Sequence, residues 1–591
     1  MSRNAINGDP LTWGNSHHLT IDWVDRVVAD QLGAYKDYSE INEHKNEKAG
    51  WEEHLEHLDE CGLDVRWWEY EGKGRKDGVL APLVVCLYEY FNTSWMHVAD
   101  HEGLVVVTFE YHRNQRRPEG GLGALGFGPR EDEIIGYHTV IQRCIEKYGC
   151  DPRRVYINGL SYGDMSTMLT VQKYPDEFAG AAFVNGPSSW FNIDRYGCFE
   201  SMPAIPTMHF RSDDDFTCDG FPFPDHAGIE GWLRNIRSRQ TVINRDVWMG
   251  QNGCDCTTPQ IRTDAYRAFL RYPGAEGKGD TIFVELNRHS HIMPIDNAQL
   301  MWDNLFSRYR RADGGGVECL DGSWRADEGA VAMVAGLPAA YVGNARIGLP
   351  AAPVILDARD PQPKMSVTYC ETECAGSTFY APVEILKDGF GLDWSYRKND
   401  LSLSEFAEGS ADDEITLEDG VITFSCGGRT YELLTNTAIA MIDGRVRDIE
   451  RPPLTIGGHL MVPVRHVAEL LGLFASERND AIYVCDHPFE MGFTLTRLLR
   501  EEILPDERYV PVFSVKANPA ENGTCEISAD RLREGRTLAL KIAPDSGYEV
   551  DKVAARMNGF EAKADKIGED EWWVCNVLGD VEVEVTFKPV A

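Results

Sequence analysis

Short apolar runs alternate with amphipathic segments in the first half of the chain. The runs are typical of buried parallel strands and lie at 83–87, 104–109, 155–158, 181–184, 207–210 and 281–286. The segments between them have apolar residues at helical spacing, and we expect helices at 134–148, 164–174 and 296–310. Repeated strand–helix units predict an α/β domain with a mainly parallel sheet covered on both faces. We assign this domain to residues 63–315.

The segments on either side of this domain have a different pattern. Residues 1–62 are polar and have no strong periodicity, and their better helical stretch is 34–58. We expect an N-terminal extension with one or two helices there. After about residue 315, Gly, Ala and Pro become frequent, which predicts either a linker region over 316–364 or the start of a new domain.

An internal repeat organises residues 365–490. The first copy has Ala381-Pro382-Val383, then Gly391-Leu392 and Asn399-Asp400. The second copy repeats this spacing with Val462-Pro463-Val464, Gly472-Leu473 and Asn479-Asp480. Both copies predict a short helix between the Pro and the Gly, followed by a strand at 401–403 or 481–484. The pattern indicates two copies of one small α+β unit.

The C-terminal residues 508–591 alternate apolar and polar positions with a period of two. Strands are predicted at 537–542 and 581–587, and turns at Asn522-Gly523 and Ser546-Gly547. This pattern indicates a small all-β module. A chain of 591 residues with these parts is long enough for about three to five domains.

Composition excludes several classes of function. The chain has 58 Lys and Arg against 94 Asp and Glu, a net charge of −36, which opposes binding to nucleic acid or to an anionic lipid surface. No apolar stretch is long enough to span a membrane. No apolar signal-peptide region is visible, so we expect either a cytoplasmic protein or one whose signal has been removed. The 15 cysteines contain no paired CxxC motifs, and we expect no metal and no cofactor.

The segment Gly159-Leu160-Ser161-Tyr162-Gly163 follows a predicted strand and precedes a predicted helix. This context is typical of a nucleophile elbow, in which a serine lies on a tight strand-to-helix turn. We therefore expect Ser161 to be a nucleophile. The backbone N–H of Tyr162, at the start of the helix, is a candidate donor to an oxyanion.

A serine nucleophile on this scaffold requires an acid and then a histidine further along the chain. The strand 207–210 is followed by three acids, Asp213, Asp214 and Asp215, any of which can orient a histidine. The strand 281–286 is followed by His289 and His291, and either is a candidate general base.

Residues 151–163 resemble the polyhydroxybutyrate depolymerase and feruloyl esterase-like group of α/β-hydrolases, and 174–182 fit the same family. The resemblance covers about 63–312. In that family the acid ends a Gly-x-x-Asp turn, which implies Asp214, and the histidine is commonly followed three residues later by Pro, which implies His291. The resemblance implies a serine ester hydrolase with a Ser-His-Asp triad.

Two positions depart from the family pattern. The family usually has Leu-His-Gly in the oxyanion loop, where this chain has Leu87-Tyr88-Glu89, and it often has Gly where this chain has Asp164. The second oxyanion N–H is expected from Glu89 or Tyr90. A Glu89 carboxylate that pointed inward would oppose a developing oxyanion.

Two tryptophans, Trp95 and Trp190, are candidates for stacking on an aromatic or sugar ring of the substrate. Ordinary core packing is the other interpretation of each.

The C-terminal half has two further resemblances. Residues 452–472 look like the small N-terminal stalk domain of copper amine oxidases, but His459 and His466 have no third histidine beside them, so no copper is expected. Residues 508–591 are similar to the internalin-type B repeat of bacterial surface proteins. Together they imply a secreted or cell-surface protein, with contact to cell wall or polysaccharide through these modules.

The sequence therefore predicts a secreted serine hydrolase that acts on esters of phenolic acids, carbohydrates or short hydroxyacids. Two alternatives remain at this point. One is a peptidase or acyltransferase with the same triad, and the other is a degenerate hydrolase that acts as a surface-binding protein.

Overall fold

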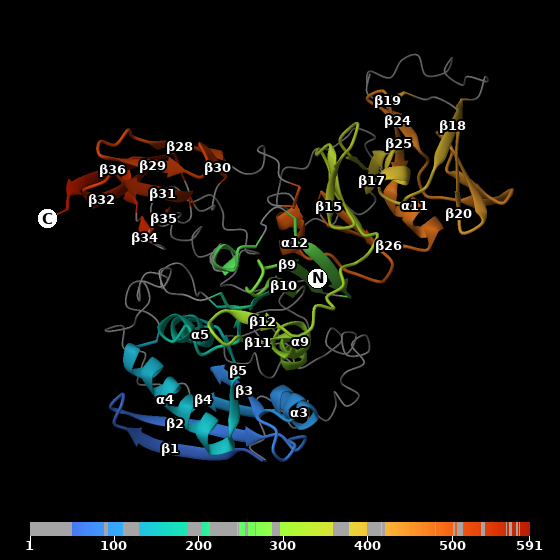
Figure 1. Ribbon diagram of the computed structural model, residues 1–591. Coiled ribbons are helices and arrows are strands. Elements are labelled where there is room, and N and C mark those ends of the chain that lie inside the picture. Colours follow the sequence, from blue (N-terminus) through green and yellow to red (C-terminus); the bar gives the residue numbers. More distant parts are fainter. Residues whose placement is uncertain are drawn as a thin grey trace. The chain divides into compact units, whose positions relative to one another are not determined.

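The structure is a computed structural model of the chain. It describes residues 50–87, 93–109, 129–186, 204–212, 245, 248–254, 258–265, 267–286, 296–357, 377–398, 415–416, 420–478, 480–499, 503–504, 512–533, 538–562, 564–566, 570–574, 577 and 579–590. The chain divides into two compact units, shown with their elements in Figure 1. Unit 1 contains residues 1–256, 270–324 and 507–591, and unit 2 contains 257–269 and 325–506.

A ten-stranded sheet forms the centre of the first half of the chain. Its strands, in spatial order, are β1 (Glu52–Leu58), β2 (Leu63–Glu71), β4 (Val105–Phe109), β3 (Ala81–Leu87), β5 (Cys150–Leu160), β6 (Gly180–Val184), β7 (Thr207–Ser212), β10 (Thr281–Leu286), β9 (Arg267–Tyr272) and β8 (Gln260–Asp264). The six strands from β4 to β10 run parallel to their neighbours, and β1 and β2 are antiparallel. This sheet confirms the α/β-hydrolase fold class.

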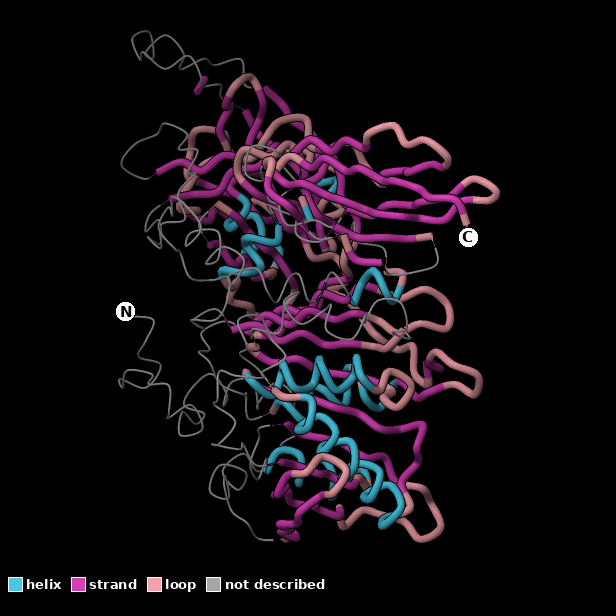
Figure 2. Tube along the Cα trace, turned by 90° about the vertical axis from the view of Figure 1, so that its left-hand side faces the viewer, coloured by secondary structure: helices cyan, strands magenta, loops and turns pink. Residues whose placement is uncertain are grey.

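Helices cover both faces of this sheet, and Figure 2 shows them lying along its strands. Among the described residues they include α3 (Thr93–Glu102), α4 (Glu131–Tyr148), α5 (Tyr162–Lys173), α9 (Asn297–Asn304) and the 3₁₀ turn η4 (Phe306–Arg308). Ile157 belongs to the core that contains Tyr137 of α4 and Met168 of α5. Its neighbour Tyr156 stacks on Phe306, with ring centroids 4.9 Å apart. Because successive strand residues point to opposite faces, α4 and α5 cover one face and η4 covers the other.

The start of the domain differs from the prediction. Residues 52–58 form the edge strand β1, which pairs with β2, whereas the sequence suggested a helix over 34–58 and a domain that starts at residue 63. β1 is rich in Glu and His because an edge strand exposes most of its side chains; only Leu58 is buried in it. The predicted helix 296–310 is also shorter, since α9 ends at Asn304 and β11 (Tyr309–Arg311) pairs with β12 (Val317–Cys319).

Unit 2 contains three five-stranded sheets. The first has β15 (Ala345–Gly348), β14 (Ala339–Val342), β13 (Val331–Val334), β27 (Ala481–Cys485) and β26 (Phe474–Arg478). The second has β16 (Val354–Asp357), β17 (Ser377–Pro382), β25 (His459–Pro463), β24 (Leu454–Ile456) and β19 (Ile415–Thr416). The third has β18 (Trp394–Lys398), β20 (Gly420–Cys426), β21 (Arg429–Leu434), β22 (Ile439–Ile442) and β23 (Arg445–Asp448). The helices in the described part of unit 2 are α10 (Ile385–Asp388), α11 (Val464–Leu471) and α12 (Phe493–Leu498).

Of the two interpretations of 316–364, the linker is wrong, because β13 to β16 form within it, and the start of a new domain agrees with unit 2, which includes 325–506. Gly343, for example, belongs to a tight hairpin turn rather than to a spacer: it has a φ of 50° and Asn344 a φ of 72° between β14 and β15. β13 pairs with β27, which lies about 150 residues later in the chain. That pairing is the long-range contact that the local composition does not reveal.

The internal repeat is real and longer than the motif suggested. The predicted short helices are α10 and α11, and the predicted strand 481–484 is β27, while 401–403 lies outside the described residues. β14, β15 and β16 begin at 339, 345 and 354, and β22, β23 and β24 begin 100 residues later in each case, at 439, 445 and 454. Ala381 and Val462, equivalent residues of the two copies, are paired across β17 and β25. The antiparallel pairing of equivalent residues relates the copies by a local two-fold axis.

The C-terminal residues form the expected all-β module. One sheet has β30 (Arg531–Arg533), β28 (Val512–Ala517), β36 (Val581–Pro589), β32 (Tyr548–Met557) and β33 (Phe560–Ala562). The other has β29 (Gly523–Ile527), β31 (Leu538–Pro544), β35 (Glu571–Val574) and β34 (Asp565–Lys566). The predicted turns contain Asn522 at a φ of 69° and Gly547 at a φ of 87°.

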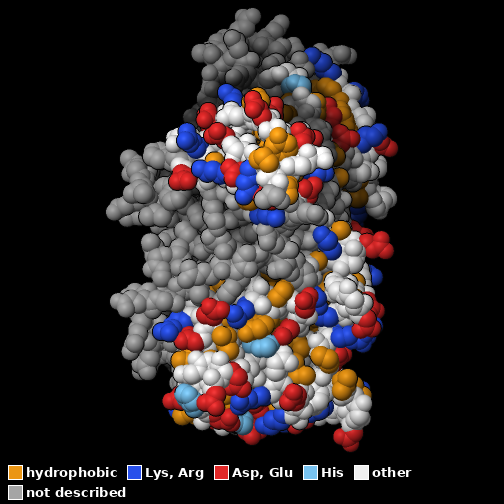
Figure 3. All heavy atoms as spheres, turned by 60° about the vertical axis from the view of Figure 1, so that its left-hand side comes forward, with side chains coloured by type: hydrophobic (Ala, Val, Ile, Leu, Met, Phe, Trp, Pro, Cys, Tyr) orange, Lys and Arg blue, Asp and Glu red, His pale blue; other side chains and the backbone are white. Residues whose placement is uncertain are grey.

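The described surface is charged and mixed in sign. On the face shown in Figure 3, acidic and basic side chains are interspersed with small apolar groups. Among the described helices, none is long and apolar enough to cross a membrane.

Candidate active site

The Gly-x-Ser-x-Gly segment lies between β5 and α5, as its sequence context predicts. β5 ends at Leu160, α5 begins at Tyr162, and Ser161 is the single residue between them. Ser161 has a φ of 60° and a ψ of −114°. A residue other than glycine in such a conformation carries about 1–3 kcal/mol of strain, so the surrounding structure must impose it. This is the sharp strand-to-helix geometry of a nucleophile elbow.

The two glycines of the motif make this turn sterically feasible. A Cβ atom added at Gly159 would lie 2.4 Å from both the carbonyl carbon and the oxygen of Gly163. Real Cβ atoms do not approach backbone atoms so closely, and backbone cannot move aside as a flexible side chain can. The chain can therefore fold back on itself here only because Gly159 has no side chain.

The turn lies at the half-buried start of a helix whose middle is buried. Leu160, Ser161 and Tyr162 are half-buried, whereas Gly163 to Gln172 are all buried. The Ser161 N–H donates to the Val184 carbonyl of β6 at 2.9 Å, which fixes the turn to the next strand. Ser161 therefore presents its hydroxyl at the N-terminal end of α5, where the helix dipole favours negative charge.

Asp164, the departure from the family pattern, has a structural role in this turn. It is buried in the first turn of α5, and its Oδ2 accepts a hydrogen bond from the Gly186 N–H at 3.1 Å. A Cβ atom at Gly186 would lie 2.2 Å from the Asp164 side chain, so glycine is required there too. The carboxylate thus ties α5 to the residue pair that follows β6.

The parallel strands leave the sheet at the level of Ser161. Leu160 is in register with Val184, Val184 with Phe210, and Phe210 with Val284. Residues that follow β6, β7 and β10 therefore leave the same edge as Ser161, because these strands point in the same direction. The acids after β7 and the histidines after β10 follow the strands that lie two and three places from β5.

Most of the side chains predicted for the site lie outside the described residues. They are Glu89, Tyr90, Trp190, Asp213, Asp214, Asp215, His289 and His291. Ser161 and Tyr162 are described, and the predicted strand and helix on either side of them are confirmed.

Trp95 is a core residue. Its side chain has no exposed surface, and its ring stacks on Phe306 with centroids 5.9 Å apart and an interplanar angle of 17°. This placement favours the packing interpretation of Trp95 over a direct contact with substrate.

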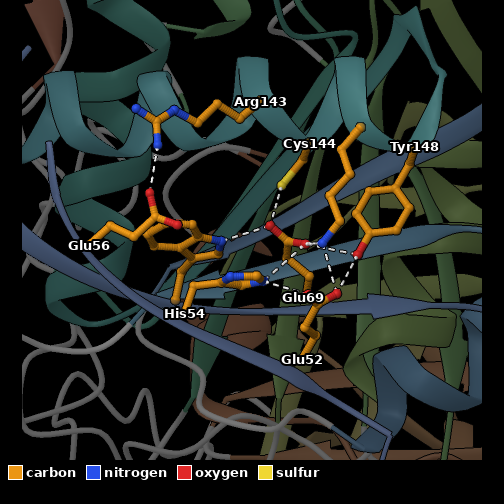
Figure 4. Close-up of polar contacts among 9 residues, drawn as sticks. Glu52, His54, Glu56, Glu69, Arg143, Cys144 and Tyr148 are labelled. Atoms are coloured by element: carbon orange, nitrogen blue, oxygen red, sulfur yellow. Dashed lines mark hydrogen bonds and ion pairs between the residues drawn. The ribbon is translucent and has the colours of Figure 1, made fainter.

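A second polar cluster lies on β1, β2 and α4, and we call it the Glu69 network (Figure 4). Glu69 is buried and accepts hydrogen bonds from Trp67 Nε1 at 2.8 Å, Lys147 Nζ at 2.6 Å and Tyr148 OH at 2.8 Å. Burial alone would raise the pKa of Glu69, but these hydrogen bonds outweigh it and hold the pKa at about 2. The carboxylate is therefore ionised at every ordinary pH.

The Glu69 network contains ligand types suited to a metal ion. Within the described part of the chain, Glu52, His54 and Glu69 are the one set of three whose ligand atoms lie within 4.8 Å of one another. The ammonium of Lys147 lies 2.8 Å from Glu52 and 2.6 Å from Glu69, in the place that a cation would take. Burial would lower the pKa of Lys147, but the hydrogen bonds to both carboxylates raise it above its usual value. We assign the network a stabilising role.

Two features of the site region were not predicted from the sequence. One is the Asp164–Gly186 contact, which joins residues far apart in sequence. The other is the burial of Arg211 on β7 and of Glu285 on β10, which are adjacent in register. The alternation of polar residues in 207–211 was the available signal, but the sheet partner is not predictable from it.

The chain shows low-identity similarity to ester hydrolases. No family model matches it. The bifunctional acetylxylan esterase/xylanase XynS20E of Neocallimastix patriciarum is 26% identical over 155 residues, which cover 26% of this chain and 20% of that protein. The chain therefore matches only about a fifth of that curated relative, and the resemblances of 365–490 and 508–591 stay predictions.

The chain is also similar to two solved structures of hydrolases. An acetyl xylan esterase from Aspergillus awamori has a TM-score of 0.32 at 15% identity, covering 44% of this chain and 98% of that one. A serine hydrolase homologue from Coxiella burnetii has a TM-score of 0.27 at 14% identity, covering 43% and 97%. Because these scores are low, the fold assignment depends on the strand order and registers of the sheet.

Proposed function

We propose that the protein is a serine hydrolase that cleaves carboxylic esters, with Ser161 as nucleophile, His291 as general base and acid, and Asp214 as the orienting acid. The observation that carries the proposal is the backbone of Ser161, a strained turn at the half-buried end of a buried helix. The parallel strands support it, because the acids and histidines follow strands that end at the same level.

The proposed reaction has two steps. Ser161 Oγ attacks the acyl carbon while His291 accepts its proton, and the tetrahedral oxyanion collapses to an acyl-serine as His291 protonates the leaving alcohol. Water, activated by His291, then attacks the acyl-serine and releases the acid. Asp214 holds the histidine in the required tautomer. The backbone N–H groups of Tyr162 and Glu89 donate to the oxyanion in both steps.

The substrate we propose is an acetyl or feruloyl ester carried on a carbohydrate polymer. Trp190 stacks on an aromatic or sugar ring of this substrate. The relative from Neocallimastix patriciarum supports an acetylated xylan as the first to test, and short hydroxyacid esters are the next class. Action outside the cell, with the C-terminal modules in contact with polysaccharide, belongs to the same proposal.

Labelling with a fluorophosphonate probe, followed by peptide mass spectrometry and hydrolysis of p-nitrophenyl acetate, tests the nucleophile. We expect modification of Ser161, and a loss of at least about 10⁴-fold in kcat for Ser161→Ala. The matched control is Ser166→Ala, one turn later in α5, where the hydroxyl only donates to the Tyr162 carbonyl at 3.0 Å. A Ser161→Ala protein with full turnover would exclude the proposal.

The acid and the base are identified by single substitutions in the same assay. We expect His291→Ala to abolish probe labelling and His289→Ala to retain it. Among Asp213→Asn, Asp214→Asn and Asp215→Asn, we expect only the second to lower kcat by orders of magnitude. Loss with His289→Ala or another Asp→Asn variant would reassign that role without changing the nucleophile.

A further inference from the structure

The segment that ends β6 contacts the Ser161 turn at two points. At the start of the turn, the Ser161 N–H donates to the Val184 carbonyl at 2.9 Å. Three residues later, the Asp164 carboxylate accepts a hydrogen bond from the Gly186 N–H at 3.1 Å. A carbonyl and an N–H that are two residues apart in sequence therefore hold both ends of the first turn of α5.

Asn185 lies between these two contacts and turns the chain. It is fully buried and has a φ of 46°, in the left-handed region that residues other than glycine rarely adopt. Its own N–H donates to the Phe210 carbonyl of β7 at 3.2 Å. The chain thus continues its pairing with β7 as far as Asn185, and the next N–H, that of Gly186, meets the helix instead.

Gly186 and Asp164 are complementary in size. A Cβ atom at Gly186 would lie 2.2 Å from the Cβ and Cγ atoms of Asp164 and 2.5 Å from its Oδ2. The φ of Gly186 is not in the left-handed region, so the position requires the absence of a side chain rather than a glycine backbone. Asp164 is 2% exposed. Its carboxylate therefore fills the space that a side chain at position 186 would need.

Ser161 needs this support because its conformation is unfavourable. A residue with a side chain relaxes from a φ of 60° and a ψ of −114° unless its surroundings prevent it. Within α5, the Met165 N–H donates to the Ser161 carbonyl at 3.3 Å, which is long for a backbone hydrogen bond. The helix alone therefore holds the turn weakly, and the contacts with Val184 and Gly186 supply a further constraint.

We propose that Asp164 is a positioning residue that holds Ser161 in its strained conformation by fixing the first turn of α5 to Gly186. The inference rests on the proposed function, since it assigns a role in presenting that nucleophile. Asp164 acts through the backbone and not by contact with the substrate. The same turn carries the Tyr162 N–H, so the contact also fixes the proposed oxyanion donor relative to the serine hydroxyl.

Loss of the Asp164 carboxylate should lower the reactivity of Ser161 more than substrate binding. In Asp164→Ala the first turn of α5 can shift relative to β6, and a shift of about 1 Å at a reacting group costs up to about 10²-fold in rate. The rate constant of fluorophosphonate labelling and kcat should both fall about 10–100-fold, with KM within about threefold. Asp164→Asn keeps an oxygen acceptor of the same shape, so its labelling should stay within about threefold of the wild type.

Gly186→Ala tests the same contact from the other side. The added methyl group would overlap the Asp164 side chain, so labelling should slow as in Asp164→Ala. The double variant Asp164→Ala/Gly186→Ala removes the overlap, and should label no more slowly than either single variant. Two independent defects would multiply instead.

The strain at Ser161 provides a readout that does not require catalysis. Ser161→Gly relieves the backbone, so its melting temperature should exceed that of Ser161→Ala by about 2–4 °C. In the Asp164→Ala background the turn has already relaxed, and the same comparison should give a difference of less than about 1 °C.

Asp280 offers a matched control. It is 4% exposed, and its Oδ1 accepts a hydrogen bond from the Gly274 N–H at 3.1 Å, the distance of the Asp164 contact. Asp280 immediately precedes β10, so it lies at the end of the parallel strands remote from Ser161. Asp280→Ala should lower the melting temperature, while labelling of the folded protein stays within about twofold of the wild type.

The experiment measures labelling at Ser161, kcat and KM for p-nitrophenyl acetate, and the melting temperature of each full-length variant. Slow labelling of folded Asp164→Ala, near-normal labelling of Asp164→Asn and a reduced strain difference in the Asp164→Ala background support the proposal. Normal labelling of Asp164→Ala, or equal losses in Asp164→Ala and Asp164→Asn, overturn it. A labelling loss that only follows the unfolded fraction also overturns it.

Two further outcomes have a defined meaning. If Asp164→Ala does not fold, Asp164→Gly replaces it in each comparison, since glycine is the residue that the resembling family often has there. A wild-type protein that neither turns over ester nor labels at Ser161 refutes the proposed function. The comparison of melting temperatures at position 161 then still decides whether Asp164 holds the strained turn.

Discussion

The Ser161 turn and the Glu69 network are two polar regions of the same domain that differ in burial and in backbone strain. Glu69 is 4% exposed and accepts hydrogen bonds from Trp67, Lys147 and Tyr148, so its buried charge is compensated. Ser161 is half-buried, is strained at a φ of 60°, and lies where the carboxyl ends of the parallel strands meet. A saturated polar cluster stabilises the fold, whereas a strained and partly exposed one is suited to chemistry.

The largest expected contrast is between Glu69→Gln and Ser161→Ala. Glu69→Gln removes a buried charge together with the hydrogen bonds that stabilise it, and should lower the free energy of unfolding by about 3 kcal/mol while kcat stays within about twofold. Ser161→Ala should do the reverse, losing activity without losing stability. Urea denaturation and ester hydrolysis on both variants provide the measurements. A fully folded Glu69→Gln protein with a lowered kcat would contradict this distinction between the two regions.

The pH dependence of the stability lost in Glu69→Gln provides a second test of the role of Glu69. The pKa of Glu69 is held at about 2, against an ordinary value of 4.5. A lowered pKa stabilises the fold above the unfolded-state pKa, and this contribution is lost as pH falls toward the folded-state value. The stability difference between wild type and Glu69→Gln should therefore be constant from pH 7 to about 5 and shrink between about 4.5 and 2. A difference that grows on acidification would contradict the assignment.

A smaller effect is expected from relieving the strain at the turn. Glycine adopts a positive φ at little steric cost, so Ser161→Gly should be more stable than Ser161→Ala by about 1 kcal/mol. Both variants lack the hydroxyl, so the comparison isolates the backbone. Melting temperatures of the two provide the measurement. Equal values would show that the surrounding structure does not hold Ser161 under strain.

The smallest effect concerns the periphery of the Glu69 network. Arg143 on α4 pairs with Glu56 at 3.0 Å, as Figure 4 shows, but the two side chains are 43% and 50% exposed. Solvent screens such pairs, so Arg143→Ala should change the free energy of unfolding by no more than about 0.5 kcal/mol. A loss as large as that of Glu69→Gln would mean that the network is one cooperative unit rather than a buried centre with exposed neighbours.

Local patterns in the sequence predicted much of unit 1. The apolar runs became β3, β4, β6, β7 and β10, and the amphipathic segment 134–148 became α4. α4 could be predicted because its start and end depend on residues close together in sequence. At its start Glu133 accepts a hydrogen bond from the Arg130 N–H at 2.6 Å, and Gly149, with a φ of 57°, ends the helix. The Ser161 turn could be predicted for the same reason, since its two glycines lie within five residues.

Predictions failed where the partner of a segment decided its structure. The polar segment 52–58 is a strand because β2 pairs with it, and 331–348 forms strands because β27 pairs with β13. Neither segment has a strong local preference. The repeat was detected from Pro382 and Pro463 and their following glycines, but its extension through β14 to β16 became visible only when equivalent strands were seen in equivalent places.

The sequence by itself determined the alternation of buried strands and helices in unit 1, the serine turn and the acidic character of the chain, because these depend on residues close together or on composition alone. Only the tertiary structure decided that Asp164 meets Gly186, that Glu69 is surrounded by donors, and that Arg211 and Glu285 share a register row at the level of Ser161. Strand order and register bring together residues tens of positions apart, and a shift of one residue would turn each side chain to the opposite face.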